Sequence, residues 1–264
     1  MKIKQNHLIA FSPCGGTLAV LRAIGAGLEG QARELDLTLP AARKSSHSFG
    51  PDDLVVIGFP VYGGRLPRTA GDVFATLQGR ETPVVLAAVY GNRHYEDAIL
   101  EMQREAEARG FVPIAAAAAL AEHVYVEEVA RGRPDAADVD ILSGFGRAVA
   151  AYARSMGSPG EEAFVAPGEF PYRKETMRVG ATPKTGESCT RCGHCAAICP
   201  SGAIPASAPD TADTEVCIMC MACVKKCPVQ ARVPVHPAYE QARSWLRANC
   251  KERKEPEFFP ESLR

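Results

Sequence analysis

The sequence lacks the features that mark membrane, secreted and nucleic-acid-binding proteins. Its 264 residues carry a net charge of −1, so no basic excess would attract nucleic acid or an anionic membrane. No apolar run approaches the roughly 18 residues that a membrane span needs. The opening segment, MKIKQNHLIAFSP, has an apolar stretch of only four residues, too short for a secretory signal. We therefore expect a cytoplasmic protein with no membrane span and no nucleic-acid partner.

Aromatic residues are also scarce, at 7% of the chain with a single tryptophan, Trp245. The chain shows no hydrolytic triad and no metal-hydrolase motif. Its 46% hydrophobic and 23% charged residues are typical of a soluble globular protein. The length allows one large domain or two ordinary ones.

Cysteine is plentiful but unevenly distributed. Eight of the ten cysteines fall between Cys189 and Cys227, whereas Cys14 and Cys250 stand apart. In a cytoplasmic chain such crowding favours metal binding over disulfides. The eight lie in two repeats of Cys-x2-Cys-x2-Cys-x3-Cys-Pro, which read CTRCGHCAAICP (189–200) and CIMCMACVKKCP (217–228).

This spacing is that of bacterial-type ferredoxins, which carry two 4Fe–4S clusters. The two-residue gaps place three thiolates on one cluster, and the fourth cysteine, after a longer gap, reaches the neighbouring cluster. We predict that cluster one is bound by Cys189, Cys192, Cys195 and Cys227, and cluster two by Cys217, Cys220, Cys223 and Cys199. Zinc would favour ligands grouped in two pairs. We interpret His194, inside the first repeat, as a solvent-facing spacer.

The first half of the chain alternates apolar runs with helical patterns. The runs 54–61 and 84–91 are continuously apolar, which is typical of strands covered on both faces. Residues 8–11 predict a first strand and the alternating leucines of 35–39 an edge strand. The segment FVPIAAAAAL is ambiguous, because alanine favours helix, but its place after a helical pattern predicts a fifth strand.

Five βα units predict an α/β fold with a five-stranded parallel sheet and helices on both faces. We expect this domain to span residues 1–157. A linker rich in proline and glycine follows at 158–184, then the two-cluster domain at 185–236 and a mixed-charge tail at 237–264.

Three unusual loops follow the first, third and fourth predicted strands. They are SPCGGT (12–17), PVYGGRLP (60–67) and YGNRHYED (90–97). In a sheet of order 2-1-3-4-5 these loops meet at one edge, where such folds bind ligands. Alone, SPCGGT could hold a phosphate or simply turn the chain, and it matches neither the P-loop nor the dinucleotide motif.

Together these loops, the segment AEHVYVEEVARGRPDAAD and the cysteine repeats resemble the EFR1-family ferredoxins, in which a flavodoxin-like domain is fused to a two-cluster ferredoxin domain. The resemblance implies that the first loop holds the phosphate of FMN and that the other two flank the flavin ring. The implied FMN-binding residues are Ser12, Cys14, Gly15, Gly16, Thr17, Pro60, Val61, Tyr62, Gly63, Gly64, Gly91, Asn92 and Tyr95.

The sequence departs from flavodoxins at Cys14, where threonine or serine is usual, and at Gly16, where asparagine is frequent. Tyr62 and Tyr95 could cover the flavin ring or serve as ordinary packing aromatics. Arg65 and Arg93 fit surface charges, and the residues of AEHVY fit the end of a strand.

We therefore expect an electron carrier that passes single electrons between two 4Fe–4S clusters and an FMN, with redox proteins as partners. Two alternatives stay open. One is a flavin-dependent reductase of a small molecule, which would have room for a substrate beside the flavin. The other is a flavin-free iron–sulfur protein whose first domain only docks partners.

Overall fold

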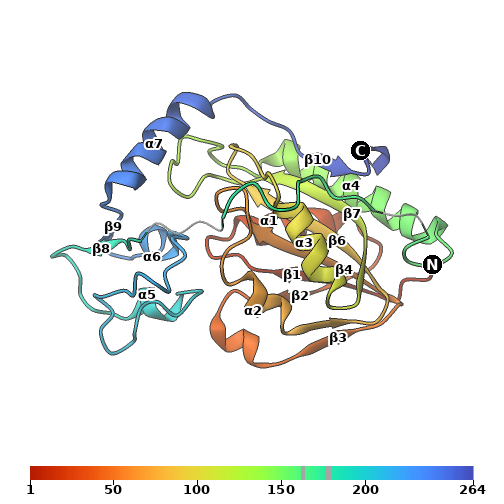
Figure 1. Cartoon of the computed structure of the whole chain (residues 1–264), viewed down its shortest axis with the longest axis horizontal. Helices are drawn as coiled ribbons and strands as arrows, with labels where there is room; N and C mark the ends of the chain where they lie inside the picture. The colour runs from red at the N-terminus through yellow and green to blue at the C-terminus, as the bar shows by residue number, and fades with distance from the viewer. Residues whose placement is uncertain (162–163, 176–179, 264) are drawn as a thin grey trace.

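The structure is a computed structural model that describes residues 1–161, 164–175 and 180–263 (Figure 1). A six-stranded sheet forms the centre of its larger part. The strands are β1 (Gln5–Ala10), β2 (Ala32–Asp36), β4 (Asp53–Pro60), β6 (Thr82–Tyr90), β7 (Phe111–Leu120) and β10 (Glu257–Phe259). They are ordered β10–β7–β6–β4–β1–β2, and only β10 runs antiparallel to its neighbour.

The five parallel strands therefore have the order 2-1-3-4-5, which confirms the predicted flavodoxin-like sheet. The alanine-rich segment is β7, as expected from its position. Residues 115–119 are fully buried, because β7 lies between β6 and β10 with both faces covered. This tertiary setting overrides the helix propensity of alanine.

Helices cover both faces of the sheet. They are α1 (Gly16–Gly27), α2 (Ala70–Phe74), α3 (Ala98–Glu107) and α4 (Ala136–Ser155). Helices α1 and α4 pack on one face, and α2 and α3 on the other. The first pair approaches so closely that a Cβ atom at Gly27 would lie 1.9 Å from the carbonyl oxygen of Ser143.

A second, smaller sheet was not predicted. It pairs β3 (His47–Phe49) with β5 (Leu77–Gly79) in parallel, after the short helix η1 (Pro40–Lys44). Three-residue strands carry too little periodicity to be recognised in sequence.

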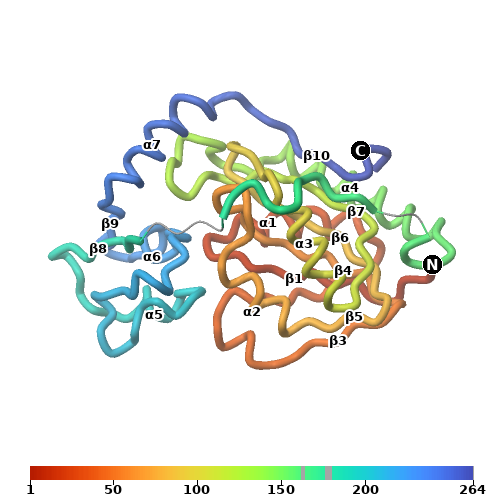
Figure 2. The backbone as a smooth tube through the Cα atoms, in the orientation of Figure 1, coloured from red at the N-terminus to blue at the C-terminus, as the bar shows by residue number. Residues whose placement is uncertain are grey.

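The cysteine repeats form a separate lobe beside the sheet, seen at the left of Figures 1 and 2. Its elements are β8 (Lys184–Thr185), α5 (His194–Ala197), α6 (Ala222–Lys225) and β9 (Arg232–Val233). The two strands pair antiparallel and join the ends of the lobe.

The described part of the predicted linker packs along the first domain. The Asp97 carboxylate accepts hydrogen bonds from the amides of Glu169 (3.0 Å) and Arg173 (2.8 Å). Gln103 accepts one from the amide of Ala166 at 3.0 Å. Residues 162–163 and 176–179 of this segment lie outside the described residues.

The segment predicted as a tail folds back onto the first domain. It forms α7 (Pro237–Asn249), β10 and η2 (Glu261–Leu263), and β10 adds the sixth strand that the sequence did not predict. The Phe258 ring stacks on that of Phe145 in α4, with centroids 4.3 Å apart.

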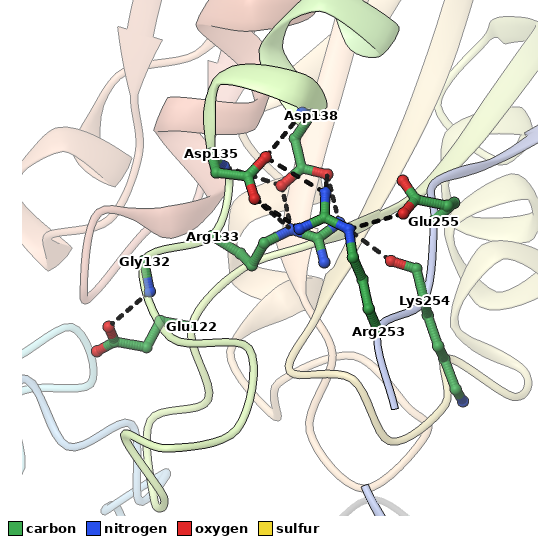
Figure 3. A network of polar contacts seen from close by, with 8 residues as sticks. All are labelled: Glu122, Gly132, Arg133, Asp135, Asp138, Arg253, Lys254 and Glu255. Atoms are coloured by element: carbon green, nitrogen blue, oxygen red, sulfur yellow. Dashed lines mark hydrogen bonds and ion pairs between the residues drawn. The ribbon is translucent and has the colours of Figure 1, made fainter. Parts of the chain in front are cut away.

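Ion pairs anchor the same segment beside the start of α4 (Figure 3). Arg253 pairs with Asp135 at 2.6 Å, and the buried Arg133, which pairs with the buried Asp138, also donates to the carbonyl oxygen of Lys254 at 3.1 Å. The end of the chain is therefore part of the first domain's core and polar network.

We expect Phe258→Ala to destabilise the protein by about 3–5 kcal/mol, because it empties a buried aromatic site and loosens the edge strand. Chemical denaturation followed by circular dichroism measures this. Phe170→Ala is the control, since Phe170 is 60% exposed and rests on Arg104. Its loss should cost about 1 kcal/mol or less. Equal effects of the two changes would contradict the role of β10.

Candidate functional site

The cysteine lobe contains two small cavities. Each is bordered by four cysteines, and neither foursome comes from one repeat. The first cavity is lined by Cys189, Cys192, Cys195 and Cys227, and the second by Cys199, Cys217, Cys220 and Cys223. The structure thus brings together the two crossed sets that the spacing predicted.

The two repeats also share one backbone conformation, offset by 28 positions. Arg191 and Met219 have φ of 53°, and Gly193 and Met221 are likewise left-handed. In each repeat an amide two residues after the first cysteine donates to that cysteine's sulfur, at 3.4 Å. Such amide donors stabilise thiolate ligands.

The surroundings fit an anionic cluster. Arg232 is only 3% exposed and donates to the carbonyl oxygen of Thr211 at 3.0 Å and towards the Cys195 sulfur at 3.8 Å. Its guanidinium also donates to the carbonyl oxygens of Pro183 (3.2 Å) and Pro209, no carboxylate pairs with it among the described residues, and its Nε atom has no partner. A negative group nearby would balance the charge of this buried cation, and a cluster held by four thiolates would provide one. No three His, Cys, Asp or Glu side chains of the described residues are arranged to hold a single metal ion.

The two cysteine sets differ in exposure. Burial raises the pKa of Cys220 well above its usual value and that of Cys223 to about 12. Cys192 is exposed. For Cys227 burial is the largest single effect and raises the pKa, but hydrogen bonds from several backbone amides together outweigh it and lower the pKa. The set that includes Cys220 is therefore the inner one, and the set that includes Cys192 lies at the surface.

A larger cavity, with about 1040 Å³ of free space including its mouth, lies at the edge of the sheet where the three predicted loops end. Nine of the residues predicted to bind FMN line it. They are Ser12, Cys14, Gly16, Thr17, Pro60, Val61, Tyr62, Gly63 and Gly91. This confirms that the three loops meet at one site.

The first loop is shaped as the start of α1. Gly15 adopts φ of 94° as the residue before the helix, and the Ser12 hydroxyl accepts a hydrogen bond from the amide of Leu18 at 3.0 Å. The amides of Gly16 and Thr17, at the first two positions of α1, have no acceptor among the described residues. Unpaired amides at a helix start attract an anionic group such as a phosphate.

Four predicted FMN residues do not line the cavity. Gly15 precedes α1, Gly64 lies against Glu96, and the Asn92 side chain donates to the carbonyl oxygens of Cys250 (2.9 Å) and Glu252 (2.7 Å). Tyr95 is 6% exposed.

The Tyr95 hydroxyl donates to Glu257 at 2.8 Å, so its ring does not cover the cavity. The side chains of Tyr95 and Asn92 therefore do not line the cavity. Both hold the returning C-terminal segment.

Other residues of the cavity were missed or interpreted as structural. The loop after β7 contributes His123 and Tyr125, the loop after β6 contributes Arg93, and α7 contributes Trp245 and Leu246. The only sequence signal for the first pair was the polar segment AEHVY, and nothing in the sequence placed α7 beside the sheet.

His123 is a neutral wall residue of this cavity. Burial, with Arg93 and Lys225 nearby, lowers its pKa to about 4, so the ring carries no charge at neutral pH. Its Nδ1 atom accepts from the amide of Tyr125 at 3.0 Å. The proton of the neutral ring is therefore on Nε2.

The cavity wall touches the inner cysteine set. Burial raises the pKa of Cys14, which keeps its proton and donates it to the carbonyl oxygen of Cys220 at 3.1 Å. Tyr62, Ile218 and Cys220 pack in the same apolar cluster. Cys14 thus joins the first loop to a predicted ligand of cluster two.

Further contacts fix the lobe against the first domain. Lys225 pairs with Glu122 at 2.6 Å, and the Tyr239 hydroxyl donates to the carbonyl oxygen of Tyr125 at 3.2 Å. Arg68 donates to the carbonyl oxygen of Cys217 at 3.1 Å. The lobe and the sheet therefore share one polar and apolar interface.

Comparison with known proteins identifies the lobe. Residues 181–228 match the 4Fe-4S dicluster domain family. No curated protein matches the chain. The C-terminal part is thus a 4Fe–4S domain, and such clusters transfer single electrons.

Among solved structures, a flavodoxin from the domain Archaea is 13% identical, with 57% of this chain and 99% of that one covered and a TM-score of 0.39. The two-electron reduced flavodoxin of Megasphaera elsdenii is 14% identical, with 57% and 99% covered and a TM-score of 0.36. The rubredoxin oxygen:oxidoreductase of Desulfovibrio gigas is 10% identical, with 58% and 37% covered and a TM-score of 0.36. The flavodoxin-like fold itself rests on the strand order.

None of the helices in the described part of the chain is long and apolar enough to cross a membrane.

We expect Cys199→Ala to remove the cluster at Cys217, Cys220 and Cys223 while sparing the one nearest in sequence. Cys227→Ala should do the reverse, and each variant should keep about four of eight irons. Iron and sulfide counts on anaerobically prepared protein, with electron paramagnetic resonance spectra of the reduced forms, measure this. If Cys199→Ala destroyed only the cluster at Cys189, Cys192 and Cys195, the crossed sets would be refuted.

Proposed function

We propose that this protein is a cytoplasmic electron carrier that passes single electrons between two 4Fe–4S clusters and an FMN bound at the edge of the flavodoxin-like sheet. Membership of the EFR1-family ferredoxins is part of this proposal. So is a division into a flavodoxin-like domain, completed by the C-terminal segment, and a two-cluster domain.

The contact between Cys14 and Cys220 carries the proposal. A residue that lines the cavity donates a hydrogen bond to the backbone of a predicted cluster ligand, at 3.1 Å. A group bound in this cavity would therefore lie on the other side of a single wall from cluster two. Tyr62 and Cys220 pack in one group of apolar side chains, which keeps water out of that wall.

The residues around the cavity suit FMN. The amides of Gly16 and Thr17 would hold its phosphate at the start of α1, and Tyr62 offers a ring face to the flavin. Gly91 has to lack a side chain, because a Cβ atom there would lie 2.5 Å from the His123 ring. Bound FMN would supply exchange of one or two electrons, whereas the clusters exchange one at a time.

The exposures of the two cysteine sets support an order of the two clusters along the molecule. Cluster two would lie inside, against the cavity, and cluster one at the surface, where Cys192 is exposed. A redox partner protein would then exchange electrons at the cluster-one end. The chain's own residues hold the cofactors, exclude water and keep Cys14 protonated.

We expect the protein to bind one FMN per chain and Tyr62→Leu to weaken binding about two- to tenfold, through loss of about 0.5–1.5 kcal/mol of ring contact. Tyr95→Leu is the matched control. This ring does not line the cavity, so the variant should bind FMN with the affinity of the wild type. Quenching of FMN fluorescence on titration measures both.

Absence of FMN binding by the wild-type protein would contradict the proposal and favour the flavin-free docking protein. A weaker affinity in Tyr95→Leu than in Tyr62→Leu would instead contradict the assigned cavity.

A second candidate function is reduction of a small molecule in the same cavity. Helix α7 adds a further wall to the cavity, beyond the three loops that would hold a flavin. In this wall Leu246 is buried and Trp245 is 51% exposed. This leaves an aromatic face where a planar substrate could enter.

Steady-state reduction of a soluble quinone by the chemically reduced protein separates the two functions. A reductase predicts saturation and a KM that rises several-fold in Trp245→Ala. A carrier predicts a rate that is linear in quinone concentration and equal in both proteins.

A further inference from the structure

Tyr125 lies in the loop between β7 and α4. Its Oη atom is buried and has no hydrogen-bond partner among the described residues. Buried hydroxyls are nearly always satisfied in native proteins. An orphan at this position therefore indicates an acceptor that arrives with a bound group.

The ring of Tyr125 sits between the two parts of the molecule. One side lines the large cavity. The other packs with Met219, Met221 and Cys217 of the second repeat and meets the Tyr239 ring edge-on at 5.2 Å. Tyr125 is thus a residue of the first domain placed directly against the inner cysteine set.

Tyr125 lies against the predicted ligand set of cluster two. Tyr125 and Cys217 pack against the same apolar group of Met219, Met221 and Tyr239. Burial raises the pKa of Tyr125, so the phenol is a donor at neutral pH. The sulfur atoms of a bound cluster carry negative charge and would be strong acceptors.

We propose that Tyr125 donates a hydrogen bond to a sulfur atom of the bound cluster two and thereby raises the reduction potential of that cluster. A donor that withdraws charge from a ligand sulfur stabilises the reduced cluster, which holds one more negative charge. This inference rests on the proposed binding of cluster two by Cys220 and its three companions.

The consequence concerns the interface. The site of cluster two would receive two hydrogen bonds from the first domain, one from Cys14 at the carbonyl oxygen of Cys220 and one from Tyr125 at a sulfur of the cluster. The reduction potential of the inner cluster would then depend on how the lobe docks on the sheet, whereas the potential of the outer cluster would not depend on this docking.

The test compares wild type with Tyr125→Phe, which keeps the ring and removes only the donor. Redox titration of anaerobically prepared protein, followed by electron paramagnetic resonance, gives the midpoint potentials of both clusters. We expect cluster two to become about tenfold harder to reduce, equivalent to about 59 mV for one electron, with cluster one unchanged. Tyr239→Phe is the control, because that hydroxyl is already bonded to the carbonyl oxygen of Tyr125, and its potentials should match the wild type.

Eight irons per chain with equal potentials in wild type and Tyr125→Phe would overturn this inference and leave the proposed function intact. Equal shifts of both clusters would also overturn it, because they would show a change in the whole lobe. Only four irons in the wild-type protein would contradict the proposed second cluster itself, and the inference with it.

Discussion

An iron–sulfur cluster buried between two domains needs hydrogen-bond donors and positive charge that its short binding motif cannot supply. Each repeat gives only its own backbone amides, such as that of Met219 to Cys217. The rest comes from elsewhere in the chain. Arg232 lines the cavity of the first cysteine set, and Cys14 of the first domain donates to Cys220. The lobe and the sheet are therefore linked by the electrostatic needs of the inner cluster site as well as by apolar packing.

The C-terminal segment is what keeps the two parts together. Helix α7 leaves the lobe, crosses beside the cavity and leads to β10, which pairs with the edge of the sheet (Figure 1). Tyr239, at the start of the C-terminal segment, donates a hydrogen bond to the loop that carries Tyr125. Arg253, further along the same segment, pairs with Asp135. Because both ends of the lobe are tied to the first domain, the contact at Cys220 can be maintained without a large interface.

The features that followed from the sequence are those with a local signature. Continuous apolar runs marked β4 and β6, and cysteine spacing alone predicted the two sets of four cysteines that the structure brings together, because cluster geometry dictates the gaps between ligands. The features that did not follow depend on contacts between distant segments. Tyr95 lies in a loop that does border the cavity, but its direction is set by Glu257, more than 150 positions away.

Likewise, the three residues of β10 have no periodicity, and the role of Tyr125 depends on a lobe that begins after the linker. An aromatic residue in a binding loop can be recognised in sequence, whereas the face it presents cannot.

The proposed function requires that the cavity and cluster two form one electron-transfer unit across the Cys14–Cys220 wall. Flash photoreduction of the FMN in fully loaded protein, followed through the absorbance of the clusters, tests this requirement directly. We expect cluster reduction with a first-order rate that does not depend on protein concentration. A rate that rises in proportion to protein concentration would show that electrons pass only between molecules and would contradict it.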